Sequence, residues 1–143
     1  MSKILVTGGS GFIGSHFIRT YLNDHPSDEV LNVDLLTYAG RKENLLDVEK
    51  NPRYSFVHAD ICDAKRMEQV MSGCDAVIHF AAESHVDRAI ENATVFLQTN
   101  VLGTHSLLEA ARKNDVKKFL CISTDEVYGH ILDGSFVESD TLN

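Results

Sequence analysis

The residues KILVTGGSGFIG, at positions 3–14, decide the fold of this protein. The apolar run KILVT predicts a buried strand, and a glycine-rich turn and a helical pattern follow it. Gly9, Gly11 and Gly14 fit the spacing G-x-G-x-x-G, and Gly8, Gly11 and Gly14 fit the wider T-G-x-x-G-x-x-G. Glycine suits this turn because the chain bends sharply and its backbone can approach a phosphate closely. The free N–H groups at the start of the next helix therefore predict a pyrophosphate site.

An acidic residue in the second strand narrows the choice of ligand. Asp34 lies near the end of the apolar run 29–35, twenty positions after Gly14. A carboxylate there can accept hydrogen bonds from both hydroxyls of a ribose, and it repels a 2′-phosphate. This favours NAD over NADP, although Arg41 and Lys42 are close enough in the sequence to weaken the preference.

Apolar runs alternate with helical patterns along the rest of the chain. Strands are predicted at 3–7, 29–35, 54–60, 75–82 and 117–124, and helices at 12–24, 41–50, 64–73 and 92–115. Continuous apolar strands between helices predict an α/β fold, with a parallel sheet covered on both faces and right-handed crossovers. The weak pattern of residues 130–143 predicts a loop, which can hold one short strand at 135–137.

The composition excludes several classes of partner. The chain has 21 Asp and Glu against 13 Lys and Arg, a net charge of −8, so we expect no nucleic-acid or anionic-membrane partner. No apolar run could span a bilayer and no signal peptide precedes the first strand, so we expect a cytoplasmic protein. Cys62, Cys74 and Cys121 fit no metal or redox motif and are predicted to be reduced thiols. No metal site is predicted.

Two further strand ends carry residues suited to a ligand. Ligands of open parallel sheets lie at the carboxyl ends of the strands, near the point where the strand order reverses. Asp60 and Ile61 follow the third strand, where a carboxylate could meet an adenine amino group. A helix cap is an equally good role for Asp60, and Asp63 competes for that role. Ala81 and Ala82 follow the fourth strand and are small enough to let a cofactor pass.

Several motifs together carry a resemblance to a known family. They are TGGSGFIGSH, NVDLLTYAG, HADICD, HFAAESHVDR, TNVLGT and ISTDEVYG. From Lys3 to about Glu138 the chain resembles the extended short-chain dehydrogenase/reductase family, and within it the dTDP-glucose 4,6-dehydratases. STDEVYG, at 123–129, points most specifically to that branch, whereas Arg41 departs from the asparagine usual after TYAG. The resemblance implies a Rossmann-type doubly wound parallel sheet, ending here after about five strands, with NAD as cofactor and the nucleotide sugar dTDP-glucose as substrate.

The resemblance also implies roles for individual residues. The cofactor is expected to contact Gly8, Gly11, Phe12, Ile13, Gly14, Asp34, Leu35, Leu36, Thr37, Asp60, Ile61, Phe80, Ala81, Ala82, Glu83, Ser84 and Thr99. Ser84 and Thr124 are expected to contact the sugar, with Thr124 at its 4-hydroxyl. Asp125 is expected to be the general acid and Glu126 the general base, in a cycle that oxidises C4, removes water across C5 and C6, and returns the hydride to C6. Without the family context, a solvated turn is the alternative for these two carboxylates.

The tyrosine base of the family is not found where it is expected. C4 oxidation in the family uses a Y-x-x-x-K pair, and only Tyr38 and Lys42 have that spacing. Because they lie in the loop after the second strand, we interpret this match as coincidence. We therefore expect an inactive N-terminal fragment, with residues 1–143 forming an incomplete NAD-binding domain of a homodimeric two-domain enzyme. A stand-alone NAD-binding module stays open. A nucleotide-sugar epimerase is disfavoured, because C4 epimerisation does not need the Asp–Glu pair.

Overall fold

Five parallel strands form one sheet in the order β3-β2-β1-β4-β5. The structure is a computed structural model that describes residues 1–142. The strands are β1 (Lys3–Thr7), β2 (Glu29–Asp34), β3 (Tyr54–His58), β4 (Ala76–His79) and β5 (Lys118–Cys121). The order reverses between β1 and β4, so the predicted doubly wound α/β fold is confirmed, and the carboxyl ends of β1 and β4 flank the switch point.

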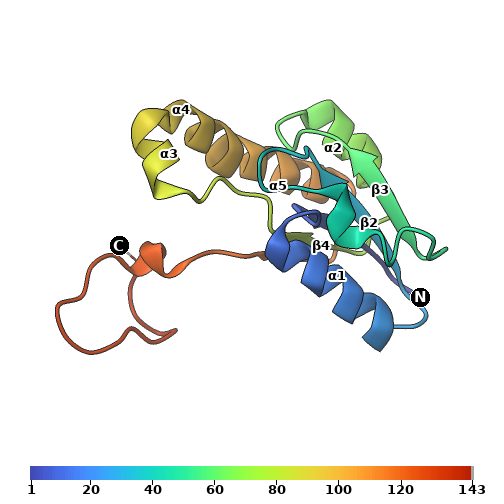
Figure 1. Ribbon diagram of the computed structural model, residues 1–143, viewed down its shortest axis with the longest axis horizontal. Coiled ribbons are helices and arrows are strands. Elements are labelled where there is room, and N and C mark those ends of the chain that lie inside the picture. The colour runs from blue at the N-terminus through green and yellow to red at the C-terminus, as the bar shows by residue number, and fades with distance from the viewer. Residues whose placement is uncertain (143) are drawn as a thin grey trace.

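Helices cover both faces of the sheet. The helical elements of the chain are α1 (Phe12–Asp24), α2 (Ala64–Val70), α3 (Val86–Glu91), α4 (Ala93–Phe96), the π-helical η2 (Leu97–Gly103), α5 (Thr104–Lys113), and the 3₁₀ turns η1 (Lys42–Leu45) and η3 (Asp125–Tyr128). In Figure 1, α1 lies below the sheet and α2 and α5 lie above it.

Neighbouring residues of β1 supply two separate hydrophobic cores. Ile4 and Val6 pack with Ile18 of α1 on one face, while Leu5 packs with Leu107 of α5 on the other. This alternation is the two-residue period of a strand that is buried on both sides. The central strand β1 is therefore anchored from above and below, whereas β5 at the edge of the sheet is largely exposed.

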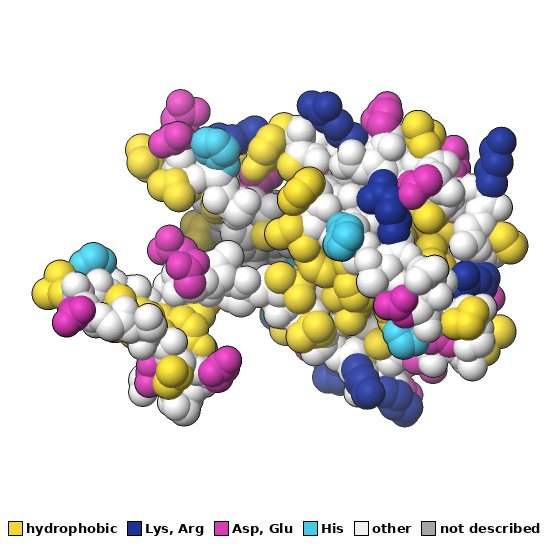
Figure 2. Space-filling model, turned by 60° about the horizontal axis from the view of Figure 1, so that its bottom comes forward, with side chains coloured by type: hydrophobic (Ala, Val, Ile, Leu, Met, Phe, Trp, Pro, Cys, Tyr) yellow, Lys and Arg dark blue, Asp and Glu magenta, His cyan; other side chains and the backbone are white. Residues whose placement is uncertain are grey.

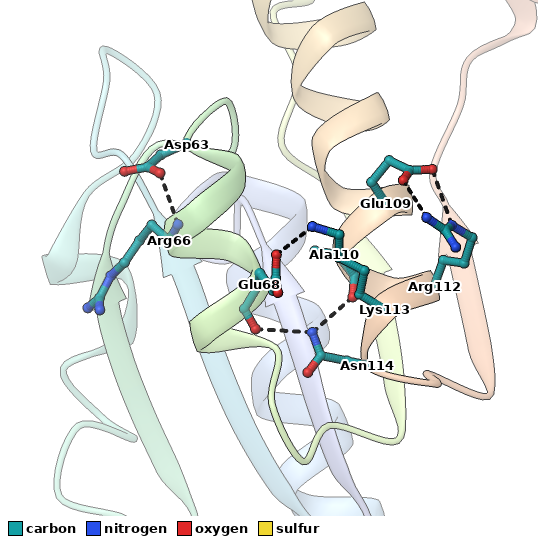
Figure 3. Close-up of polar contacts among 8 residues, drawn as sticks. All are labelled: Asp63, Arg66, Glu68, Glu109, Ala110, Arg112, Lys113 and Asn114. Carbon is teal, nitrogen blue, oxygen red and sulfur yellow. Dashed lines mark hydrogen bonds and ion pairs between the residues drawn. The ribbon is translucent and has the colours of Figure 1, made fainter.

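Polar contacts join α2 to α5 at the surface (Figure 3). Lys113 Nζ lies 2.7 Å from Glu68 Oε2, and Asn114 Nδ2 donates to the Glu68 carbonyl at 3.0 Å. An exposed ion pair of this kind contributes little by itself. At the other end of α2, the Asp63 carboxylate accepts from the Arg66 N–H at 2.9 Å, so Asp63 is the helix cap.

The predicted helix 92–115 is confirmed as a continuous helical run from Ala93 to Lys113, in which α4, η2 and α5 follow one another directly. Asn92 has φ −149° and ψ 82°, which separates α3 from α4, and a π-helical turn follows before the regular helix α5. Gly103, the last residue of that turn, lies so close to Ile61 that a Cβ there would stand 2.6 Å from its Cδ1. The helix α3 was not predicted, and of the helix predicted at 41–50 only the 3₁₀ turn η1 forms.

Residues 123–142, here called the C-terminal arm, run away from the body of the molecule (Figures 1 and 2). No strand forms between residues 130 and 142, so the short strand predicted at 135–137 is wrong. A strand needs a hydrogen-bonded neighbour, and this segment lies beside none. Its turn is instead held by the ring of Tyr128, which stacks on Phe136 with the ring centres 5.1 Å apart.

Within residues 1–142, every helix is too short or too polar to cross a membrane.

Candidate functional site

The glycine-rich turn joins β1 to α1 as the spacing predicted. Gly8 has φ +69°, a conformation that favours glycine, and a Cβ there would lie 2.6 Å from the backbone nitrogen of Ala81. The Gly8 carbonyl accepts from the Gly11 N–H at 3.1 Å, and a Cβ on Gly14 would collide with the same carbonyl. The turn is therefore tight enough that side chains would displace β4 or α1, and it leaves the N-terminus of α1 open.

Asp34 is fixed at the end of β2 by two backbone donors. Its Oδ2 accepts from the Ser10 N–H at 2.9 Å, and its Oδ1 accepts from the Leu36 N–H at 2.8 Å. Leu36 has φ +55°, an unusual conformation for a leucine, and it aims that N–H at the carboxylate. A Cβ on Gly40 would lie 2.6 Å from Oδ1. Each carboxylate oxygen keeps a free lone pair, so Asp34 can still accept ribose hydroxyls.

A cavity of about 620 Å³ opens at the carboxyl ends of the strands. Its lining brings together these predicted cofactor residues: Gly8, Gly11, Asp34, Leu35, Thr37, Asp60, Ile61, Phe80, Ala81, Ala82, Glu83 and Thr99. This size suits a site for a cofactor or other small molecule. The cavity thus joins residues from five separate segments of the chain.

Five predicted cofactor residues lie outside that lining. Phe12 and Ile13 stand exposed in the first turn of α1, and Ser84 is exposed in the loop after β4. Gly14 packs beneath the glycine turn, and Leu36 acts through its N–H to Asp34. A contact of Phe12, Ile13 and Ser84 with a ligand stays a prediction.

Sequence reasoning missed several residues of the lining. They are Ala39, Gly40, Ala59, Cys62, Val95, Gln98 and Leu102. Val95, Gln98, Thr99 and Leu102 have the spacing i, i+3, i+4, i+7, which indicates one face of a helix and could have located them.

The Cys62 thiol donates to the Gln98 carbonyl at 3.2 Å, and burial raises the pKa of this thiol. Asp60 Oδ1 accepts from the Cys62 N–H at 2.8 Å, which leaves its other oxygen free.

Beside the cavity, a buried histidine links β4 to β1 and to the helix that follows α4. His79 Nδ1 lies 2.7 Å from the Thr7 hydroxyl, and its Nε2 lies 3.0 Å from the Thr104 hydroxyl. Thr104 donates its hydrogen to the Asn100 carbonyl, so the hydrogen-bond network assigns the ring hydrogen to Nε2. Burial lowers the pKa of His79 to about 4, so the ring is neutral at pH 7.

Asn100 fixes the loop after β4 through two hydrogen bonds. Its Oδ1 accepts from the Glu83 N–H, and its Nδ2 donates to the Glu83 carbonyl, both at 2.8 Å. The Glu83 side chain is 8% exposed, and its buried Oε2 has no hydrogen-bond partner among residues 1–142. A buried acceptor left unpaired is costly.

The three predicted catalytic residues lie outside the cavity lining. Thr124, Asp125 and Glu126 are exposed in and beside η3, at the start of the C-terminal arm. The structure does not bring them to the residues that line the cavity, so their roles stay predictions.

Tyr38 and Lys42, the only pair with Y-x-x-x-K spacing, contact different partners. The Tyr38 ring lies under the Arg88 guanidinium, whereas Lys42 Nζ lies over the Phe56 ring, 5.3 Å from its centre. This separation supports the interpretation of the match as coincidence.

Comparisons with known proteins decide the family. The model of the family described as GDP-mannose 4,6 dehydratase matches residues 5–143. The chain belongs to this family. The finding also confirms the resemblance to the extended short-chain dehydrogenase/reductases and, within them, to the dTDP-glucose 4,6-dehydratases.

Three relatives show how far the similarity extends. The dTDP-glucose 4,6-dehydratase of Streptomyces griseus is 51% identical over 143 residues, which cover 99% of this chain and 43% of that protein. The low-salt glycan biosynthesis protein Agl12 of Haloferax volcanii is 51% identical over 97% of this chain and 44% of its own. The crystal structure of DesIV, a dTDP-glucose 4,6-dehydratase from Streptomyces venezuelae with NAD and TYD bound, is 52% identical, with a TM-score of 0.93 over 99% of this chain and 45% of that one. The chain therefore spans less than half the length of the relatives it matches.

Proposed function

We propose that this chain forms the NAD-binding part of a dTDP-glucose 4,6-dehydratase. The observation that carries the proposal is the cavity that places the glycine turn, the fixed Asp34 carboxylate and Glu83 around one space. The identity to solved dehydratases reaches 52%, against 34% for the UDP-glucose 4-epimerase of Thermotoga maritima. This difference favours a dehydratase over an epimerase.

The residues of the cavity fit NAD. Gly8 and Gly11 lie where the N-terminus of α1 opens onto the cavity, and this suits the pyrophosphate. Asp34 can accept the ribose hydroxyls, and the free oxygen of Asp60 can accept from the adenine amino group.

In the proposed reaction the chain's residues hold the sugar and move protons. Bound NAD would supply a hydride acceptor and donor, and it would be regenerated within the cycle. Thr124 would position the 4-hydroxyl of the sugar. Glu126 would remove the C5 proton once C4 is a ketone, because the carbonyl acidifies that proton. Asp125 would protonate the departing C6 hydroxyl, so that water leaves.

Activity by residues 1–143 alone is not expected. They contain no Y-x-x-x-K pair at the cavity, and general base catalysis is worth roughly 10²–10⁴ in rate. The test supplies the purified chain with NAD and dTDP-glucose and follows the keto sugar by its absorbance in alkali. Turnover that the Tyr38→Phe variant abolishes would show that Tyr38 and Lys42 are the base pair. Turnover that only Glu126→Gln abolishes would point to another base within these residues.

We also propose a homodimer in the cytoplasm. Leu97, Val101 and Leu108 form an exposed apolar stripe along η2 and α5, which supports pairing with a second copy. Cys62, Cys74 and Cys121 are free thiols, which supports a reducing compartment. Light scattering tests the dimer: a Val101→Glu and Leu108→Glu double variant should be monomeric where the parent is dimeric.

A further inference from the structure

A stacked pair of side chains connects two loops that border the cavity. The guanidinium carbon of Arg88 lies 3.9 Å from the centre of the Tyr38 ring. Tyr38 follows β2, between Thr37 and Ala39, which both line the cavity. Arg88 belongs to α3, which begins shortly after the lining residue Glu83. Because β2 and β4 flank β1 on opposite sides, the pair joins the two sides of the switch point.

This contact has no polar equivalent nearby. Within the described residues, no hydrogen bond or ion pair joins 35–40 to 80–92. Tyr38 is 45% exposed, so the contact lies at the surface and is not part of a packed core. Breaking it should therefore free the two loops without unfolding the sheet.

Arg88 also lies beside a second, smaller cavity. It lines this cavity of about 290 Å³ together with Glu83, Glu91 and Asn92. The two carboxylates there would attract the guanidinium if it left the Tyr38 ring. Arg88 thus contacts the loop after β2 and lines the smaller cavity beside the loop after β4.

The larger cavity has an acidic lining, which bears on the role of the Arg88–Tyr38 contact. Among the described residues its lining includes the carboxyl groups of Asp34, Asp60 and Glu83, and no lysine or arginine. A pyrophosphate bound there would gain from a nearby cation, and Arg88 contacts Tyr38, which stands between the lining residues Thr37 and Ala39.

We propose that Arg88 and Tyr38 form a latch that retains the dinucleotide, an inference that rests on the proposed NAD site. The closed latch ties the loop after β2 to α3, so the cofactor leaves only when the stack opens. Retention suits a reaction that returns its hydride to the substrate, because the cofactor need not exchange between turnovers.

The test measures NAD release from the immobilised chain by surface plasmon resonance. Arg88→Gln and Tyr38→Leu should each speed release roughly two- to fivefold, the range for a partly exposed cation–π contact. The double variant should release no faster than the quicker single variant. Tyr38→Phe keeps the ring, and Arg112→Gln removes an exposed arginine of α5, so both should behave as the parent chain does. The latch would be overturned if the single variants released NAD at the parental rate. It would also be overturned if the two increases in release rate multiplied in the double variant.

Hydrogen exchange of the ligand-free protein separates this inference from the proposed function. In Arg88→Gln the amides of residues 36–41 should exchange several-fold faster than in the parent, whether or not NAD binds. Unchanged exchange there would overturn the contact itself. A parent chain that shows this protection but binds no NAD would overturn the proposed function, and with it the role of the latch.

Discussion

The cavity and the C-terminal arm differ in how the chain holds their functional side chains. Around the cavity, Asp34 accepts from two backbone N–H groups and Asn100 makes two bonds to the backbone of Glu83. In the arm, Asp125 and Glu126 are exposed and belong to a short 3₁₀ turn. Residues 1–142 therefore pre-organise a binding site, whereas the predicted acid and base stand in solvent. The proposed cofactor function and the proposed proton transfers consequently depend on separate parts of the chain.

The largest expected difference comes from one substitution made in both regions. Gly8 and Gly134 both have positive φ, but a Cβ on Gly8 would meet the Ala81 backbone, whereas a Cβ on Gly134 would meet nothing within 4 Å. Gly8→Ala should lower the free energy of unfolding by roughly 3 kcal/mol or more, because backbone strain and overpacking add. Gly134→Ala should cost about 1 kcal/mol or less. Urea unfolding measures both, and equal losses would contradict the contrast.

The buried His79 predicts a pH dependence that belongs to the cavity region. Burial holds its pKa near 4, below the ordinary 6.5, so the unfolded chain binds a proton more readily between these values. The stability from this group is complete above about pH 6.5 and is lost as the pH falls toward 4, by at most about 3 kcal/mol. The His79→Gln variant should be less stable at pH 7, and its free energy of unfolding should change less with pH between about 4 and 6.5. A His130→Gln control in the arm should keep the parental profile, and a flat parental profile would refute the assignment.

Asn100→Ala should produce a smaller loss than the glycine substitution. It removes both bonds to the Glu83 backbone, each of which is worth roughly 0.5–1.5 kcal/mol, and it should also weaken NAD binding because the loop after β4 is freed. Asn23→Ala is the matched control, since Asn23 is exposed and bonds only to Asp24. Denaturant unfolding and calorimetry check the two effects. An Asn100→Ala variant with parental NAD affinity would show that the loop does not need this support.

The smallest effects are expected in the arm. Asp125→Asn and Glu126→Gln should each change the free energy of unfolding by less than about 0.5 kcal/mol and leave NAD affinity unchanged, because both side chains are exposed. Thermal unfolding and calorimetry of the two variants suffice. A marked loss of NAD affinity in either variant would mean that the arm closes over the cavity in solution.

Much of the fold and of the cavity could be predicted because both follow from local rules. Continuous apolar runs located every strand, and the glycine spacing with Asp34 located the centre of the cavity. The π-helical turn that ends at Gly103 could not be predicted, since it depends on how closely that helix approaches Ile61. The hydrogen-bond network around His79 could not be predicted either. His79 contacts Thr7 and Thr104, which are distant from it in the sequence, and periodicity does not reveal such contacts.

Calorimetric titration with NAD and with NADP tests the central claim most directly. The account predicts that one NAD binds per chain and that NADP binds at least roughly tenfold more weakly, because a 2′-phosphate would face the fixed Asp34 carboxylate. Asp34→Asn should narrow that difference while leaving the fold intact. NADP binding as tight as NAD, or no binding of either dinucleotide, would contradict the account.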